Sequence, residues 1–300
     1  MSFELRGKTV LLTGASSGIG WVLAKALGRA GATIGISARR EDALTQLALQ
    51  IRAEGGQAHV LAADLSRRGE ATELAARARN ALGHIDVLVN NAGVGMGASQ
   101  WVGGDGDVAR ALLETNYWSP LALTAALVPE MREKKRGVVV NVSSMGAVLP
   151  FVMTGHYGSS KAALATATDA LRMELRGSGV GVLLVLPGPV ETPMLAEAKQ
   201  IGGINHVLAY AKPGNAETLA RLVVRGIERG AREIVYPRPL WMGRLFPSLG
   251  RRVTAWMMRK MPGDDPRLVA GGSTGGHEAQ EARAAFENGR ARSAHVSEVA

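Results

Sequence analysis

Short apolar runs alternate with longer amphipathic stretches along most of the chain. The apolar runs lie at 10–12, 33–37, 58–62, 87–90, 138–141, 180–186 and 234–236. Most of them lack polar alternation, which is typical of strands buried on both faces. Helical patterns lie between them, at 21–30, 41–53, 68–82, 109–131, 156–176 and 216–229. This alternation predicts an α/β fold in which helices cover both faces of one parallel sheet.

A glycine-rich turn follows the first apolar run. The segment 13–20 reads TGASSGIG and places Gly14, Gly18 and Gly20 just before a helical stretch. Glycine permits a tight turn and a close approach of backbone to a ligand, and the first N–H groups of a helix can hold phosphate oxygens. The spacing differs from the commonest dinucleotide fingerprint. A phosphate-binding turn is therefore the leading interpretation, and a turn without a ligand is the alternative.

Other chemically informative residues also follow strands, where open parallel sheets bind their ligands. Arg39 and Arg40 follow the second run, and positions 37–40 carry no acid. At this position an acid suits a free ribose 2′-hydroxyl and arginine suits a 2′-phosphate, so the pair favours NADP over NAD. Solvated surface charge is the alternative interpretation. Asp64 and Leu65 follow the third run.

Two asparagines and two small residues follow the fourth run, in the order Asn90, Asn91, Ala92 and Gly93. Asparagine side chains can tie neighbouring strands together, and the small pair leaves room for a flat ring. Taken alone, the segment is better interpreted as an ordinary asparagine-rich turn.

A serine, a tyrosine and a lysine suggest acid–base chemistry in the second half of the chain. Ser144 follows the fifth run, and Tyr157 and Lys161 are spaced to lie on one face of a helix. A phenol with a pKa of about 10 is a poor base at neutral pH, and a nearby ammonium lowers that pKa. We expect Lys161 and a positive nicotinamide ring to lower the pKa of Tyr157 by about three units, which needs roughly 4 kcal/mol. A surface Tyr–Lys pair is the alternative.

Taken together and in order, these motifs resemble the short-chain dehydrogenase/reductase (SDR) family. The resemblance covers about residues 5–240 and includes Asn116 and the Pro187–Gly188 pair. It implies one Rossmann-type, doubly wound domain with seven parallel strands in the order 3-2-1-4-5-6-7. It also implies an oxidoreductase that interconverts a carbonyl and a secondary alcohol with NADP(H). A non-catalytic NADP-binding sensor or scaffold on the same fold is the alternative.

The resemblance also implies a role for each residue of a catalytic set. Tyr157 would exchange a proton with the substrate oxygen, and Ser144 would hydrogen-bond the same oxygen. Lys161 would hold the nicotinamide ribose and tune Tyr157, and Asn116 would position a helix and a water in a proton relay. Residues expected to bind the cofactor are Gly14, Ser16, Ser17, Gly18, Ile19, Gly20, Arg39, Arg40, Asp64, Leu65, Asn91, Ala92, Gly93, Tyr157, Lys161, Pro187, Gly188, Val190 and Thr192. Ser17 departs from the basic residue that NADP-preferring members often carry there.

Residues 192–215 occupy the place of a substrate lid in relatives. The segment is mainly apolar and contains Gly202–Gly203, a candidate hinge. It therefore suggests an apolar substrate, such as a lipid, a steroid or a bulky ketone. Simple packing of the lid onto the core is the alternative.

A basic and apolar extension, residues 238–263, follows the domain expected over 1–237. It carries arginines and a lysine, no acid before residue 264, and tryptophans, leucines and methionines at helical spacing. Pro247 is expected to divide it into two short helices. A membrane surface, the substrate mouth and a subunit contact are equally weighted partners for it. Residues 264–300 are expected to be a disordered tail.

Bulk composition narrows the remaining choices. The chain has 300 residues, no cysteine and a formal net charge of +9. The absence of cysteine excludes disulfides and thiolate sites and fits a reducing compartment. The start of the chain resembles no secretory segment, and no apolar run is long enough to span a bilayer, so we expect a cytoplasmic protein or one bound peripherally to a membrane. The positive charge is concentrated in 238–263, which argues against a nucleic-acid partner, and no metal site is expected. Homo-oligomers through 109–131 and 156–176 are expected by resemblance.

Overall fold

The computed structural model describes residues 3–95, 99–200, 208 and 212–259. Its centre is a seven-stranded sheet in the order β3-β2-β1-β4-β5-β6-β7, with every neighbouring pair parallel. The strands are β1 Thr9–Thr13, β2 Thr33–Ser37, β3 Gln57–Val60, β4 Val87–Asn90, β5 Gly137–Val142, β6 Val180–Pro187 and β7 Glu233–Tyr236. The predicted fold class and strand order are confirmed. The third strand ends at Val60, two residues earlier than predicted.

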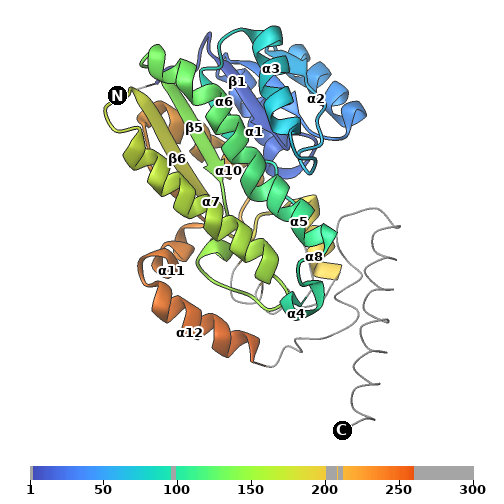
Figure 1. Cartoon of the computed structure of the whole chain (residues 1–300), viewed down its shortest axis with the longest axis vertical. Helices are drawn as coiled ribbons and strands as arrows, with labels where there is room; N and C mark the ends of the chain where they lie inside the picture. The colour runs from blue at the N-terminus through green and yellow to red at the C-terminus, as the bar shows by residue number, and fades with distance from the viewer. Residues whose placement is uncertain (1–2, 96–98, 201–207, 209–211, 260–300) are drawn as a thin grey trace.

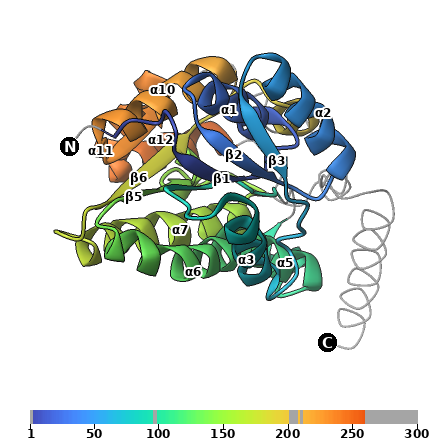
Figure 2. The same cartoon turned by 90° about the horizontal axis from the view of Figure 1, so that it is seen from above.

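Helices cover both faces of the sheet (Figures 1 and 2). One face is covered by α1 Gly18–Arg29, α2 Glu41–Ala53 and α10 Ala216–Arg229. The other is covered by α3 Glu70–Leu82, α6 Ser119–Glu133 and α7 Gly155–Glu174. Shorter helices are α4 Gln100–Gly103, α5 Asp107–Leu113, α8 Pro193–Gln200, α11 Trp241–Leu245 and α12 Pro247–Met258. Because all seven strands are parallel, their carboxyl ends lie at the same edge of the sheet.

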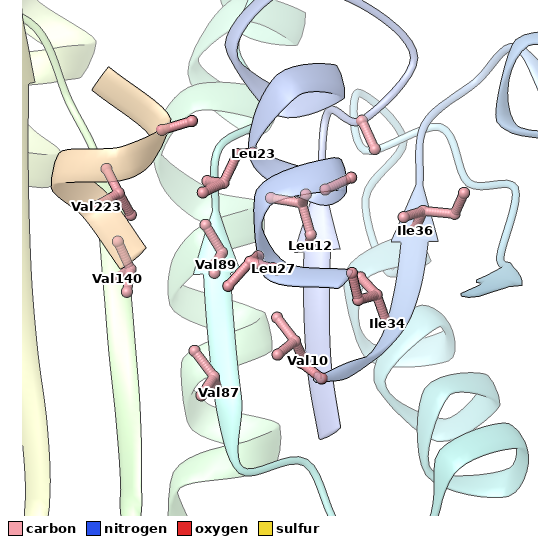
Figure 3. Close-up of a cluster of buried hydrophobic side chains, with 14 of the residues drawn as sticks. Val10, Leu12, Leu23, Leu27, Ile34, Ile36, Val87, Val89, Val140 and Val223 are labelled. Carbon is pink, nitrogen blue, oxygen red and sulfur yellow. The ribbon is translucent and has the colours of Figure 1, made fainter. Parts of the chain in front are cut away.

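Burial on both faces explains the apolar runs. Val10 and Leu12 of β1 pack with Leu23 and Leu27 of α1 (Figure 3), whereas Leu11 belongs to the separate core on the opposite face. These side chains are fully buried, and each such burial contributes about 1.5–3 kcal/mol to folding. The polar ends of the strands are thereby fixed on a rigid frame.

The long helix predicted over 109–131 has a local irregularity. A π-helical segment, Glu114–Trp118, separates α5 from α6. Within it the Thr115 hydroxyl donates to the Ala111 carbonyl at 3.0 Å, a local bond that competes with regular helix bonding. π-Helical turns are rare and often occur at functional sites, and this one contains Asn116.

The helical structure of the extension is interrupted at Phe246, between α11 and α12, as the position of Pro247 predicted. Within the lid, residues 201–207 and 209–211 lie outside the described residues, as do 260–300, which include the end of the extension and the predicted tail. In the described ranges, no helix has the length and apolar character needed to cross a bilayer.

Candidate active site

The glycine turn between β1 and α1 has space only for glycine. Gly14 and Gly18 have φ of +69° and +57°, a region that side chains disfavour. A Cβ on Gly20 would overlap the Gly14 carbonyl oxygen. Ser17 is the N-cap of α1 but makes no side-chain capping bond, and the first turn of α1 has no acidic residue. The first N–H groups of α1 can therefore serve an anion such as a diphosphate.

Thr13 and Asn91 hold this turn against the loop after β4. The Asn91 amide nitrogen donates to the Thr13 and Gly14 carbonyls at 2.9 and 3.1 Å. The Thr13 hydroxyl accepts from the backbone N–H groups of Asn91 and Ala92 at 3.1 and 3.0 Å. The Asn91 side chain thus positions the cradle, whereas the resemblance implied that it contacts the adenosine side of the cofactor.

Arg40 links the end of β2 to the same turn. Its guanidinium donates to the Ser16 carbonyl at 3.1 Å and to the Ser16 hydroxyl at 3.2 Å. Arg39, beside it, is exposed. A positive group is therefore held next to the turn at the position where a ribose 2′-phosphate is expected.

The loop after β3 presents one polar side chain and one buried apolar side chain. The Asp64 carboxylate accepts from the Ser66 N–H at 3.1 Å and from its hydroxyl at 2.7 Å. Leu65 is only 6% exposed and packs in the core beneath the sheet, and its carbonyl accepts from Ser119 at 2.9 Å. Leu65 can therefore meet an adenine ring only through its backbone, a restriction that the sequence does not reveal.

The segment after β6 forms the opposite wall of the glycine turn. A Cβ on Gly18 would lie 3.4 Å from Thr192, so Thr192 lies directly across from the turn. Val190 is buried and pairs through its backbone with Gly214, and its carbonyl accepts from the Thr192 hydroxyl at 3.1 Å. Pro187 and Gly188 precede them, where Gly188 lies against Leu240.

Ser144, Tyr157 and Lys161 converge where β5 ends and α7 begins. The Tyr157 phenol is in hydrogen-bonding reach of the Ser144 hydroxyl. The Ser144 hydroxyl accepts from the Gly146 N–H at 3.0 Å, which fixes its position. The Lys161 ammonium lies 6.0 Å from the centre of the Tyr157 ring. The structure therefore brings together the three side chains that the sequence separates by up to 17 positions.

The lower pKa expected for Tyr157, from Lys161 together with a positive nicotinamide ring, stays a prediction, because the structure contains the chain alone. Burial raises the pKa of Tyr157 above 10, and only the bond with Ser144 acts in the opposite direction. Lys161 donates to the Val142 carbonyl at 3.1 Å and not to the phenol, and burial lowers its own pKa to about 8. Desolvation outweighs the distant charge, so a lower phenol pKa would need the additional positive charge of a nicotinamide ring.

Asn116 connects the π-helical segment to the loop after β4 and to helix α7. Its amide oxygen accepts from the Val94 N–H at 2.9 Å, and its amide nitrogen donates to the Val94 carbonyl and the Ser160 hydroxyl, each at 3.0 Å. A Cβ on Gly93 would lie 2.9 Å from the Lys161 nitrogen and 3.5 Å from the Asn116 oxygen. Asn116 and Lys161 therefore flank the same glycine.

Several residues that position the site were not singled out as site residues in the sequence. Ser143 donates to the Lys161 carbonyl at 2.7 Å, and Ser160 donates to the Tyr157 carbonyl at 2.8 Å. Thr13 organises the turn, and His156 lies 2.7 Å from the Gly104 carbonyl. Small hydroxyl residues next to a motif give no distinctive pattern, so only their contacts identify them.

The observed cradle fits a dinucleotide. Glycine at 14, 18 and 20 lets the turn fold tightly at the start of α1, whose first N–H groups can hold an anion, and Arg40 adds positive charge beside it. Thr192 bounds the cradle on one side, and Tyr157 and Lys161 lie at the carboxyl end of β5. Among the described residues there is no cluster of three His, Asp or Glu side chains that could hold a metal.

Comparisons with known proteins agree with this geometry. The family model for short chain dehydrogenase matches residues 8–201. A short chain dehydrogenase of Pseudocercospora fijiensis is 40% identical over 192 residues, which are 64% of this chain and 62% of the relative. Ketoacyl reductase HetN of Nostoc sp. is 31% identical over 84% of this chain and 90% of its own length. 11-beta-hydroxysteroid dehydrogenase A of Arachis hypogaea is 32% identical over 86% of this chain and 76% of its own length.

Solved structures are similar over most of the described fold. A short-chain dehydrogenase from Sphingobium yanoikuyae in complex with NADPH has a TM-score of 0.70 and 28% identity, covering 85% of this chain and 96% of its own. L-Sorbose reductase from Gluconobacter frateurii, complexed with NADPH and L-sorbose, has a TM-score of 0.71 and 26% identity, covering 78% and 97%.

Proposed function

Because the chain belongs to the short-chain dehydrogenase/reductase family, a family of oxidoreductases, we propose that it interconverts a carbonyl and a secondary alcohol with NADP(H). The observation that carries this proposal is the convergence of Ser144, Tyr157 and Lys161 beside the glycine cradle. A hydroxyl, a phenol and an ammonium in this order suit proton transfer to a substrate oxygen. Both Tyr157 and Lys161 are present, so a non-catalytic sensor has no support.

When bound, the nicotinamide supplies or accepts the hydride. Tyr157 donates a proton to the carbonyl oxygen during reduction and accepts one during oxidation. Ser144 donates a hydrogen bond to the same oxygen as negative charge develops on it. Lys161 places positive charge near the phenol, and Asn116 fixes the loop around Gly93 against which Lys161 lies. The raised pKa of Tyr157 keeps the phenol protonated, which favours its use as the acid in carbonyl reduction.

The cofactor proposal has two parts. The diphosphate would lie on Gly14, Ser16, Ser17, Gly18 and Ile19 at the start of α1, with Gly20 keeping the turn tight. The 2′-phosphate would meet Arg40 and Arg39, which supports NADP(H) over NAD(H). The remaining proposed contacts are Asp64, the backbone of Leu65, Asn91, Ala92, Gly93, Tyr157, Lys161, Pro187, Gly188, Val190 and Thr192.

We also propose an apolar substrate. The described part of the lid, α8, presents Met194, which is 44% exposed, and buries Leu195. The names of two relatives, a ketoacyl reductase and a steroid dehydrogenase, point to lipophilic substrates. The substrate of the L-sorbose reductase is a polar sugar, so the fold itself does not require an apolar one.

The proposed setting is the cytoplasm, with residues 1–237 as the catalytic domain and no nucleic-acid partner.

Trp118 of the π-helical segment and Met173 of α7 are 54% and 64% exposed, which supports pairing of α6 and α7 with a second copy. Burying such side chains would contribute free energy to a homo-oligomer.

The test is NADPH consumption by the full chain with apolar ketones and aldehydes of graded size, and NADP reduction with the matching alcohols. We expect turnover with apolar carbonyls and a preference over sugars of at least tenfold, about 1.4 kcal/mol. Tight NADPH binding without turnover of any member in either direction would contradict the proposal.

A further inference from the structure

The extension carries many exposed apolar side chains. On α11 and α12 and the residue between them, seven large apolar side chains are 42–61% exposed. They are Trp241, Met242, Leu245, Phe246, Leu249, Val253 and Trp256. We call this set the docking face. The opposite side of α12 is buried through Thr254 and Met258, which are 5% and 6% exposed. One side of α12 therefore packs against the rest of the molecule, while apolar side chains on another side remain exposed to solvent.

The docking face is held rigidly on the catalytic domain. Cβ atoms on Gly243 and Gly250 would approach Leu149 to 3.1 and 2.6 Å, so both short helices pack closely on that side chain. Arg244 pairs with Glu233 of β7 at 2.9 Å, and this pairing raises the pKa of Arg244. Figure 1 shows α11 and α12 beyond the lower end of the sheet. The exposed apolar residues thus stand on a fixed platform.

Exposed arginines accompany these apolar side chains along the segment. Residues 237–259 contain five arginines and no acidic residue. Among the described residues, Arg244 alone of the five has an acidic partner, and Arg238, Arg251, Arg252 and Arg259 are exposed. The Arg259 guanidinium lies 4.6 Å from the centre of the Trp256 ring. Arginine beside tryptophan, above apolar side chains, is the arrangement of an interfacial helix.

We propose that α11 and α12 dock on an anionic lipid surface. Tryptophan, phenylalanine and leucine side chains would enter the acyl boundary, and the arginines would meet lipid phosphates. A second copy is a poorer occupant, because a two-fold interface would bring together the same arginines, which have no acidic partner in the described part of the chain. A nucleic acid is a poorer occupant too, because its backbone offers no match for so much exposed apolar surface.

Docking would place the mouth of the site next to the lipid. Leu149 follows Ser144 by five residues, Arg251 donates to the Val148 carbonyl at 3.2 Å, and Leu240 lies against Gly188. This consequence rests on the proposed function, since it supplies an apolar substrate directly from the bilayer to the walls that carry Ser144. The docking itself does not depend on catalysis.

The experiment is flotation of the full chain with phosphatidylcholine vesicles, with and without phosphatidylglycerol, and in the absence of cofactor and substrate. We expect binding to the anionic vesicles and its loss in the double variant Leu249→Glu, Trp256→Glu. Leu49→Glu on α2 is the matched control, because Leu49 is 60% exposed and Leu249 is 61% exposed. Arg252→Gln with Arg259→Gln should weaken binding about 25-fold, since each arginine near an anionic surface contributes about fivefold.

The proposal is overturned if wild type does not float, if both vesicle types bind equally, or if the Leu249 double variant binds like the Leu49 control. Sedimentation across protein concentrations identifies the rival, because a dimer lost on Leu249→Glu without vesicle binding would assign the face to a second copy. Unfolding temperatures of all variants show that they are folded. An enzyme that floats but turns over nothing would contradict only the proposed function.

Discussion

Replacing Gly93 with alanine tests how tightly the site is packed around the Lys161 ammonium. The new Cβ would lie 2.9 Å from the Lys161 nitrogen, whereas non-bonded atoms of this kind prefer about 3.5 Å or more. The ammonium must therefore move by roughly 0.5 Å. Because its bond to the Val142 carbonyl is already 3.1 Å long, that movement strains or breaks the bond.

The size of the effect follows from the lost hydrogen bond. A hydrogen bond to a charged group contributes about 1.5–3 kcal/mol, so a displaced Lys161 should lower kcat/KM by roughly 10- to 150-fold. The unfolding temperature should change little, because the end of a lysine side chain can move without disturbing the core.

The assay is steady-state NADPH oxidation with the best carbonyl substrate, together with a thermal melt. Gly95→Ala is the matched control, because a Cβ there would have no neighbour within 4 Å. We expect the Gly95 variant to retain wild-type kcat/KM. Equal rates for the Gly93 and Gly95 variants would refute the claim that Lys161 must stay where the structure places it.

Three further predictions concern charge, cofactor choice and the cradle. Burial lowers the pKa of Lys161 to about 8, so its charge costs about 3 kcal/mol of unfolding free energy below pH 8, and this cost fades as the pH rises toward 10.5. The unfolding free energy of wild type relative to Lys161→Met should therefore rise between pH 8 and pH 10 in denaturant titrations; a constant difference would show that the lysine is not desolvated. Arg40→Ala should raise the Kd for NADPH by roughly 10- to 150-fold and leave the Kd for NADH nearly unchanged, since only NADPH has the 2′-phosphate. Fluorescence titrations would measure both constants, and equal losses of affinity for the two cofactors would reject the 2′-phosphate assignment. Asn91→Leu removes the two hydrogen bonds to the Thr13 and Gly14 carbonyls and should lower the unfolding free energy by about 1–3 kcal/mol. It should also weaken the binding of both NADPH and NADH. Urea titration and the same binding assay would measure these effects, and unchanged cofactor binding would show that the turn holds its shape without Asn91.

The parallel sheet and the convergence of the site could be anticipated from the sequence, for physical reasons. Each buried strand is a continuous apolar run, and parallel connections deliver all carboxyl ends to one edge. The spacing of Tyr157 and Lys161 fixes their shared helix face. A resemblance carried by ordered motifs then added the strand order, which the apolar runs alone do not determine.

The parts that could not be anticipated depend on contacts between distant residues. The π-helical segment around Asn116 comes from a one-residue irregularity that a 3.6-residue period does not show. The bond of Lys161 to the Val142 carbonyl and the burial that raises the pKa of Tyr157 both depend on how the packed site brings distant residues together. The role of Asn91 in holding the turn likewise appears only when β1 and β4 lie side by side.

The Tyr157→Phe variant tests most directly whether this phenol moves the substrate proton. The change removes one oxygen from a half-buried ring and leaves the glycine cradle intact. We expect the NADPH Kd to stay within about threefold of wild type and turnover to fall by 100-fold or more, as general acid catalysis typically contributes about 10²–10⁴. Wild-type turnover by the phenylalanine variant, with NADPH still bound, would contradict the assignment.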